Sequence, residues 1–151
     1  MKTLIVGLGN PILCDDGVGI QVAHELATRV GFPDVTITET SCSGLDFIDI
    51  LTGYDKAIII DAIITRKNSP GEILRLSIDD INTTLHSNSP HDISLGEAIK
   101  LGQRLGAVMP EEIVIYGIEV SNIDTFSETC TPIVEKAIPA CVSRILKELK
   151  R

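Results

Sequence analysis

Two adjacent carboxylates, Asp15 and Asp16, follow a glycine-rich turn near the start of the chain. A short apolar run precedes the turn, and residues with helical spacing come after the acids. This order is typical of a buried strand, a loop and a helix. Because ligands bind outside the carboxyl ends of the strands in an open α/β sheet, we expect both acids at a binding edge. They would attract a cation there, or they could simply lie near a helix N-terminus, where negative charge is favourable.

A third carboxylate, Asp61, interrupts the most apolar segment of the chain, residues 57–64. That segment predicts a central parallel strand that is buried on both faces. A carboxylate in such a place must be paired, hydrogen-bonded or bound to metal, because an isolated buried charge is very costly. We favour a functional role, since Asp61 is expected at the same sheet edge as Asp15 and Asp16. The alternative is that Asp61 only accepts backbone N–H groups at the end of the strand.

One imidazole, His91, stands at the end of residues 80–92, a segment without a clear hydrophobic period. Long loops in compact domains are often functional. A helix is expected directly afterwards, over residues 94–105, so His91 could reach across the sheet edge. His86 is equally available on composition, and spacing alone does not select between the two.

Strands that alternate with helices predict one three-layer α/β domain over residues 1–151, with a mainly parallel twisted sheet of about five strands and helices on both faces. Strands are predicted at 3–8, 35–38, 57–64, 72–77 (at an edge) and 113–118, and helices at 18–30, 45–51, 94–105 and 132–149. Glu119 is expected in the loop that follows the strand at 113–118. Thr131 is expected to cap the last helix, with Pro132 at its first position. Pro139 should kink that helix or delay its start.

The composition excludes several classes of protein. A net charge of −8 on 151 residues argues against a nucleic-acid-binding or anionic-membrane surface. No apolar run is long enough for a membrane span, and no signal-peptide pattern is present. The four cysteines lack C-x-x-C spacing, which excludes a zinc ribbon and a thioredoxin motif. We therefore expect a cytoplasmic protein with reduced thiols, and a monomer, since nothing demands an oligomer.

Familiar catalytic motifs are absent. The dinucleotide fingerprint fails at Ile12, which stands where its last glycine should be, and no P-loop lysine follows the turn. Neither G-x-S-x-G nor H-E-x-x-H occurs. A pepsin-like motif is missing because Asp124-Thr125 is followed by Phe126. A cysteine nucleophile at Cys14 with His91 as its base is a minor alternative.

A family resemblance joins these residues. Gly7-Leu8-Gly9-Asn10 with Asp15-Asp16-Gly17-Val18-Gly19 resembles the opening of the hydrogenase maturation endopeptidases, which process the large subunit of nickel–iron hydrogenases. The resemblance continues at Ile60-Asp61-Ala62, Asn68-Ser69-Pro70-Gly71, Ser89-Pro90-His91 and Thr131-Pro132. It spans essentially the whole chain in the family's order.

The resemblance implies a metal site made of Asp16, Asp61 and His91, which are also the expected catalytic residues of an aspartyl-type or metal-dependent endopeptidase. The family often has Glu at the position of Asp16, so the shorter side chain here would shift the metal slightly. It also often has Asp-Gly-Gly-Thr after the second strand, where this chain reads Glu39-Thr40-Ser41-Cys42. That departure leaves the role of Glu39 open.

The resemblance also implies a substrate, the precursor of a nickel–iron hydrogenase large subunit. Its C-terminal extension would be removed after nickel insertion, by a cut just after a His or an Arg. Two carboxylates and one imidazole suit a borderline divalent ion such as nickel, which the precursor would supply and for which other divalent metals could substitute. Our hypothesis is that these three residues grip the substrate's nickel and align the scissile bond. Either a metal-bound water or a water activated by one of the acids would then attack.

Two other functions stay open at this point. The same three ligands would serve a nickel-binding hydrogenase assembly factor without peptidase activity. A small metal hydrolase on a related α/β scaffold is the third possibility, and turnover of simple esters or phosphates would be its mark.

Overall fold

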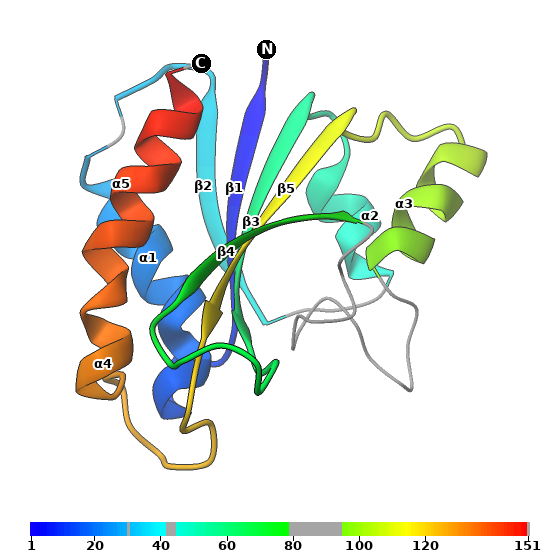
Figure 1. Cartoon of the computed structure of the whole chain (residues 1–151). Coiled ribbons are helices and arrows are strands. Elements are labelled where there is room, and N and C mark those ends of the chain that lie inside the picture. The colour runs from blue at the N-terminus through cyan, green and yellow to red at the C-terminus, as the bar shows by residue number, and fades with distance from the viewer. Residues whose placement is uncertain (30, 42–44, 79–94, 151) are drawn as a thin grey trace.

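Five strands form one sheet, and helices cover both of its faces (Figure 1). The computed structural model describes residues 1–29, 31–41, 45–78 and 95–150. The elements in chain order are β1 (Thr3–Leu8), the short 3₁₀ helix η1 (Cys14–Gly17), α1 (Val18–Ala27), β2 (Val35–Thr40), α2 (Asp46–Leu51), β3 (Lys56–Ile63), β4 (Ile73–Ser77), α3 (Leu95–Arg104), β5 (Glu112–Glu119), α4 (Pro132–Glu135) and α5 (Ala137–Leu149). Within those ranges, no helix combines the length and the apolar composition that crossing a membrane requires.

The strand order of the sheet is β2-β1-β3-β5-β4. The first four of these strands pair in parallel, and β4 runs antiparallel to β5 at the margin. The mainly parallel sheet and its extra edge strand are therefore confirmed. The central position of β3 follows from its sequence, because every residue after Lys56 up to Ile63 is buried.

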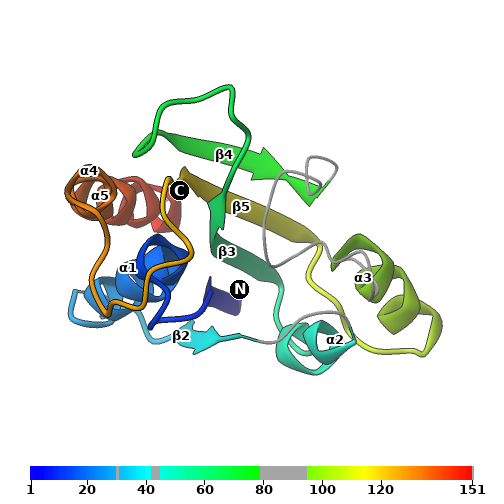
Figure 2. The same cartoon turned by 90° about the horizontal axis from the view of Figure 1, so that it is seen from below.

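Alternate residues of the central strand belong to two separate cores. Ile58 and Ile60 pack with α1, α4 and α5, whereas Ala57 and Ile59 pack with α2 and α3. Figure 2 shows these two groups of helices on opposite sides of the sheet. The predicted three-layer arrangement is thus confirmed, and it follows from the period of two along a strand.

The last helix is divided at Lys136 into α4 and α5. Pro139 is the third residue of α5, within the first turn, where a missing N–H would lack a helical partner anyway. A continuous helix would press its ring against the carbonyl group of Glu135, four residues earlier. Of the two predicted effects of Pro139, a delayed start is not seen, because α4 begins at Pro132; the structure shows instead an interruption of the helix at Lys136.

Two sequence predictions at element ends are wrong. Glu119 does not lie in a loop: it is the last residue of β5 and is buried, because its carboxylate accepts the backbone N–H of Thr65 at 3.0 Å. α1 ends at Ala27 rather than at residue 30, since the Thr28 hydroxyl donates to the Glu25 carbonyl oxygen at 2.7 Å and closes the last turn.

A buried carboxylate, Glu148, connects α5 to three strands. It accepts hydrogen bonds from Lys56 Nζ at 3.2 Å, Arg75 Nε at 2.8 Å and the Tyr116 hydroxyl at 2.9 Å. The hydrogen bond from Arg75 lowers the pKa of Glu148 most, and with Tyr116 and Lys56 it outweighs burial, so that this pKa falls to about 2.

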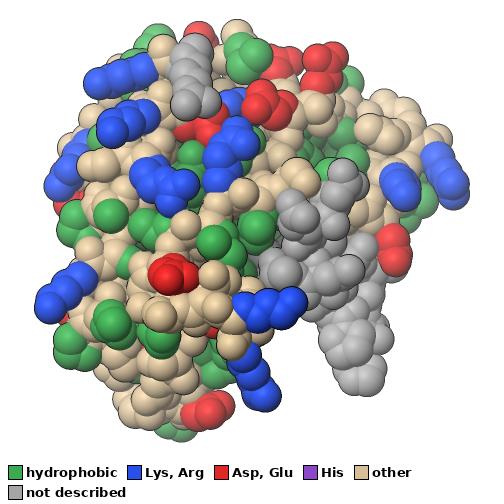
Figure 3. Space-filling model, in the orientation of Figure 1, with side chains coloured by type: hydrophobic (Ala, Val, Ile, Leu, Met, Phe, Trp, Pro, Cys, Tyr) green, Lys and Arg blue, Asp and Glu red, His purple; other side chains and the backbone are tan. Residues whose placement is uncertain are grey.

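Basic side chains surround this carboxylate at the surface. Arg75, Arg144 and Lys147 line a cavity of about 270 Å³ above Glu148. On that side of the molecule, Lys and Arg side chains gather over β4 and the C-terminal half of α5 (Figure 3). The positive charge there compensates Glu148 although the whole chain is acidic.

Replacing Glu148 should destabilise the protein in a pH-dependent way. The folded-state pKa of about 2 lies below the ordinary value of 4.5, so the stabilisation is present above pH 4.5 and is lost as the pH falls toward 2. Glu148→Gln is therefore expected to lower the free energy of unfolding by about 3 kcal/mol at pH 7. Urea unfolding between pH 7 and pH 3 should show the difference from wild type shrink in acid. Glu111→Gln, at an exposed position, is the control, and a pH-independent difference for Glu148→Gln would contradict this role.

Candidate functional site

The acidic pair lies on η1, directly after a turn that requires glycine. Gly9 has φ +145, and a Cβ at this position would lie 2.1 Å from the Asp16 carbonyl oxygen. The next residue, Asn10, donates its backbone N–H to Asp16 Oδ2 at 3.1 Å, and its own Oδ1 accepts the N–H of Ile12 at 3.1 Å. The turn therefore orients the Asp16 carboxylate, which is only 5% exposed.

A second close approach brings this segment onto the carboxyl ends of the strands. A Cβ at Gly19 in α1 would lie 2.4 Å from the carbonyl oxygen of Ile60 in β3 and 2.6 Å from that of Leu8 in β1. η1 itself contacts β3. Asp61 directly follows Ile60, is fully buried, and accepts the N–H of Ala62 on Oδ1 at 2.9 Å. Asp16 and Asp61 thus lie at the same edge of the sheet.

The neighbouring carboxylate, Asp15, is also fully buried but has different partners. Its Oδ1 accepts the Thr131 N–H at 2.7 Å, and its Oδ2 accepts the N–H groups of Ser121 at 3.1 Å and Asn122 at 3.0 Å. The hydroxyls of Thr131 and Ser121 donate to it as well. Burial alone would raise the pKa of Asp15, but the backbone bonds from Asn122, Thr131 and Ser121 and the Thr131 hydroxyl outweigh it, so this pKa is lowered.

The hydrogen bonds give Asp15 a structural role, which the sequence had left open. Asp15 holds η1 to the connection between β5 and α4. One predicted detail is wrong: Thr131 does stand at the N-cap of α4 with Pro132 next, but its hydroxyl donates to Asp15 instead of capping the helix. Sequence reasoning missed this partnership because the two residues are 116 positions apart.

The third predicted ligand, His91, lies outside the described residues, as does the alternative His86. Within the part of the chain that the structure describes, no three His, Cys, Asp or Glu side chains form a metal-holding group. The assignment of Asp16, Asp61 and His91 as ligands and catalytic residues therefore stays a prediction.

Two further residues singled out from the sequence lie near this edge. Glu39 in β2 pairs in register with Gly7 of β1, and its carboxylate forms an ion pair with His24 of α1. Cys14 is buried beside Asp15, with 3.8 Å between its Sγ and Oδ1. A carboxylate neighbour does not supply the positive charge that activates a thiolate nucleophile.

The sequence of this chain matches a known protein family. The model of the hydrogenase maturation protease family matches residues 20–148. The chain belongs to this family of proteases. The family resemblance of the sequence motifs is thereby confirmed. Asp61 and His91 fall within the matched range, and the acidic pair of η1 precedes it.

Individual relatives of these proteases agree over nearly the full length. The hydrogenase 2 maturation protease of Escherichia coli K12 is 26% identical over 152 residues, covering 99% of this chain and 92% of that protein. The structure of the hydrogenase maturating endopeptidase HybD from E. coli superposes with a TM-score of 0.81 at 24% identity, covering 99% of this chain and 93% of that one. The NiFe hydrogenase maturation protease HybD from Thermococcus kodakarensis gives 0.71 at 26% identity, with both chains fully covered.

Two matched variants should separate the roles of the adjacent acids. Asp15→Asn replaces one acceptor oxygen by an NH₂ group that faces N–H donors, and is expected to lower the free energy of unfolding by about 2–4 kcal/mol. Asp16→Asn keeps an oxygen for the Asn10 N–H and should cost about 1 kcal/mol or less. Urea unfolding of both variants at pH 7 measures this difference. A loss of about 1 kcal/mol or less for Asp15→Asn would contradict the role of Asp15 in holding η1.

Proposed function

We propose that this protease removes the C-terminal extension of a nickel–iron hydrogenase large-subunit precursor after nickel has been inserted. The substrate's own nickel would be the recognition anchor, gripped by Asp16, Asp61 and His91. Membership of the hydrogenase maturation proteases supports the reaction class. The burial of Asp16 and Asp61 at one sheet edge supports their assignment as ligands.

The proposal rests mainly on the different hydrogen-bond partners and positions of three buried carboxylates at one sheet edge. Asp15 is engaged by three backbone N–H groups and two hydroxyls that hold η1 to the connection after β5, a structural role, so we assign the ligand role in the pair to Asp16. Asp16 and Asp61 come from different elements and are both buried. Two buried carboxylates at one sheet edge favour a cation, because burial and like charge both disfavour the ionised form of a carboxyl group.

The donor set fits a nickel ion. Two carboxylates and the imidazole of His91 make a mixed oxygen and nitrogen site that suits a borderline divalent metal. Three protein ligands leave positions open, as reading a metal that the precursor already holds would require. Alignment of the scissile bond by this grip can lower the barrier by several kcal/mol, with ~7–11 kcal/mol as the upper scale. Asp16 or Asp61, as carboxylates, can accept the proton of an attacking water.

The mass of a nickel-loaded precursor, before and after incubation with the protein, tests the proposal. The large-subunit precursors of the source organism are tried in turn, with and without nickel. We expect a loss equal to the C-terminal extension, only with nickel, and at least a hundredfold slower cleavage by His91→Ala, in line with the loss of a positioning contact. His86→Ala is the matched control and should cleave as the wild type does.

Each outcome bears on a different part of the proposal. Full nickel-dependent cleavage by His91→Ala would refute the gripping model while leaving the peptidase activity in place. An unchanged mass for several precursors that nevertheless bind the protein would favour a nickel-binding assembly factor instead.

A further inference from the structure

The two margins of the sheet differ in their protection. A strand at a margin presents backbone N–H and C=O groups that can pair with another chain, and proteins usually block such edges with Lys, Pro or short strands. β4, at one margin, has five residues and carries Arg75. β2, at the other, has six residues, Val-Thr-Ile-Thr-Glu-Thr, with no Lys, Arg or Pro. Among the described strands it pairs only with β1, and it forms the outer border of the sheet in Figure 2.

One cavity opens beside β2 on the face covered by α1. It has a volume of about 270 Å³ and lies between α1 and the second half of the strand. Ala23, Ala27 and Ile37 give it apolar walls, and the His24–Glu39 ion pair closes one side. Such a cavity fits an apolar side chain.

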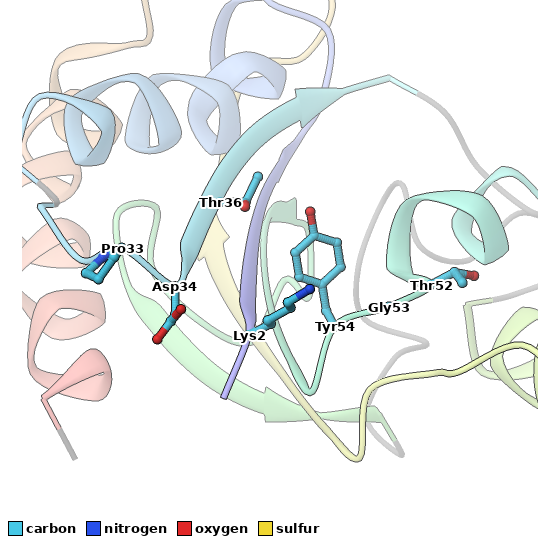
Figure 4. A pocket seen from close by; sticks show the side chains of 7 residues that line it. All are labelled: Lys2, Pro33, Asp34, Thr36, Thr52, Gly53 and Tyr54. Atoms are coloured by element: carbon cyan, nitrogen blue, oxygen red, sulfur yellow. The ribbon is translucent and has the colours of Figure 1, made fainter.

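A second cavity, of about 330 Å³, lies beside the first half of β2 on the other face. Its walls include Lys2 directly before β1, Asp34 directly before β2, Thr36 in β2 and Tyr54 in the turn before β3 (Figure 4). These side chains offer an ammonium, a carboxylate and two hydroxyls. This cavity fits a polar side chain that forms hydrogen bonds.

The two cavities lie where an added strand would need them. Ile37 faces the core under α1, and its neighbour Thr36 faces the opposite side, as the period of two requires. A peptide extended along the outer edge of β2 would direct successive side chains to alternate faces. Peptides that add a strand to a sheet edge gain affinity from backbone hydrogen bonds and specificity from pockets for alternate side chains.

The same edge leads to the candidate catalytic residues. Glu39 is in register with Gly7, and the Thr40 carbonyl oxygen accepts the N–H of Gly9 at 3.2 Å. Gly9 is the turn residue that lies against the Asp16 carbonyl. The end of β2 therefore adjoins the loop that carries Asp16.

We propose that the C-terminal extension of the precursor binds as an added strand along β2, antiparallel to it. This inference rests on the proposed function. The scissile bond must lie at the carboxyl edge, near Asp16 and Asp61, so the released extension runs from there toward the start of β2. The part of the substrate that precedes the cut belongs to the large subunit, whereas the extension is the end that is free to lie extended. The bound extension should place an apolar side chain beside Ala27. Farther from the cut, it should place a polar side chain beside Tyr54.

Filling the apolar cavity tests the proposal by kinetics. Ala27 is an exposed residue of α1 that lines this cavity, and Ala27→Trp would fill it from the rim. The substrate is the precursor that the wild-type protein cleaves. We expect KM to rise about tenfold with kcat at saturation unchanged, because the lost contacts serve binding alone. Ala140→Trp, at an exposed position of α5, is the matched control and should keep the wild-type KM.

Amide hydrogen exchange tests the strand addition itself. A synthetic peptide with the sequence of the extension should slow exchange in β2 and leave the opposite edge strand β4 unchanged. Two versions of the peptide, N-methylated at alternate residues, should differ, since only one set of N–H groups can face β2. If the wild-type protein cleaves its precursor but β2 gains no protection, or Ala27→Trp keeps the wild-type KM, this inference is wrong and the proposed function stands. If no precursor is bound or cleaved, both this inference and the proposed function are wrong.

Discussion

The structure depends above all on one buried carboxylate, that of Asp15. A charge removed from water is very costly unless hydrogen bonds replace its hydration. Three backbone N–H groups and two hydroxyls do so here, and all five come from Ser121, Asn122 and Thr131. The first loop of the chain is thereby fixed to the connection that precedes the last two helices. These hydrogen bonds also fix the position of the adjacent residue, Asp16.

A second buried carboxylate does the corresponding work at the other end of the sheet. Glu148 joins the last turns of α5 to Lys56, Arg75 and Tyr116 on three strands. Lys56 and Asp61 are both on β3, so this strand is fixed to α5 at its start and carries a candidate ligand near its end. The two networks hold the layers together from opposite ends of the sheet, and Asp16 and Asp61 lie at the end that Asp15 fixes.

The sequence predicted the layers and the edge that holds the acids because both follow from hydrophobic period. The apolar runs in β1, β3 and β5 indicate buried strands, and the four-residue spacing of apolar residues in α1 indicates an amphipathic helix. It could not tell Asp15 from Asp16, since the difference lies in partners more than a hundred residues away. Glu119 was misplaced for the same reason: a strand end with a charged residue is expected to be exposed until Thr65 is known to satisfy it. The position of His91 stays a prediction.

The long sequence separation of the Asp15 contacts has a consequence for biosynthesis. Residue 15 emerges from the ribosome early, but its hydrogen-bond donors at 121 to 131 emerge near the end of translation. Closing so long a loop is slow, and contacts of this kind form late in folding. The nascent chain therefore cannot assemble the acidic edge until almost all of it has been made. Because Asp16 lies next to Asp15, the position of this candidate ligand is likewise fixed only after residue 131 has left the ribosome.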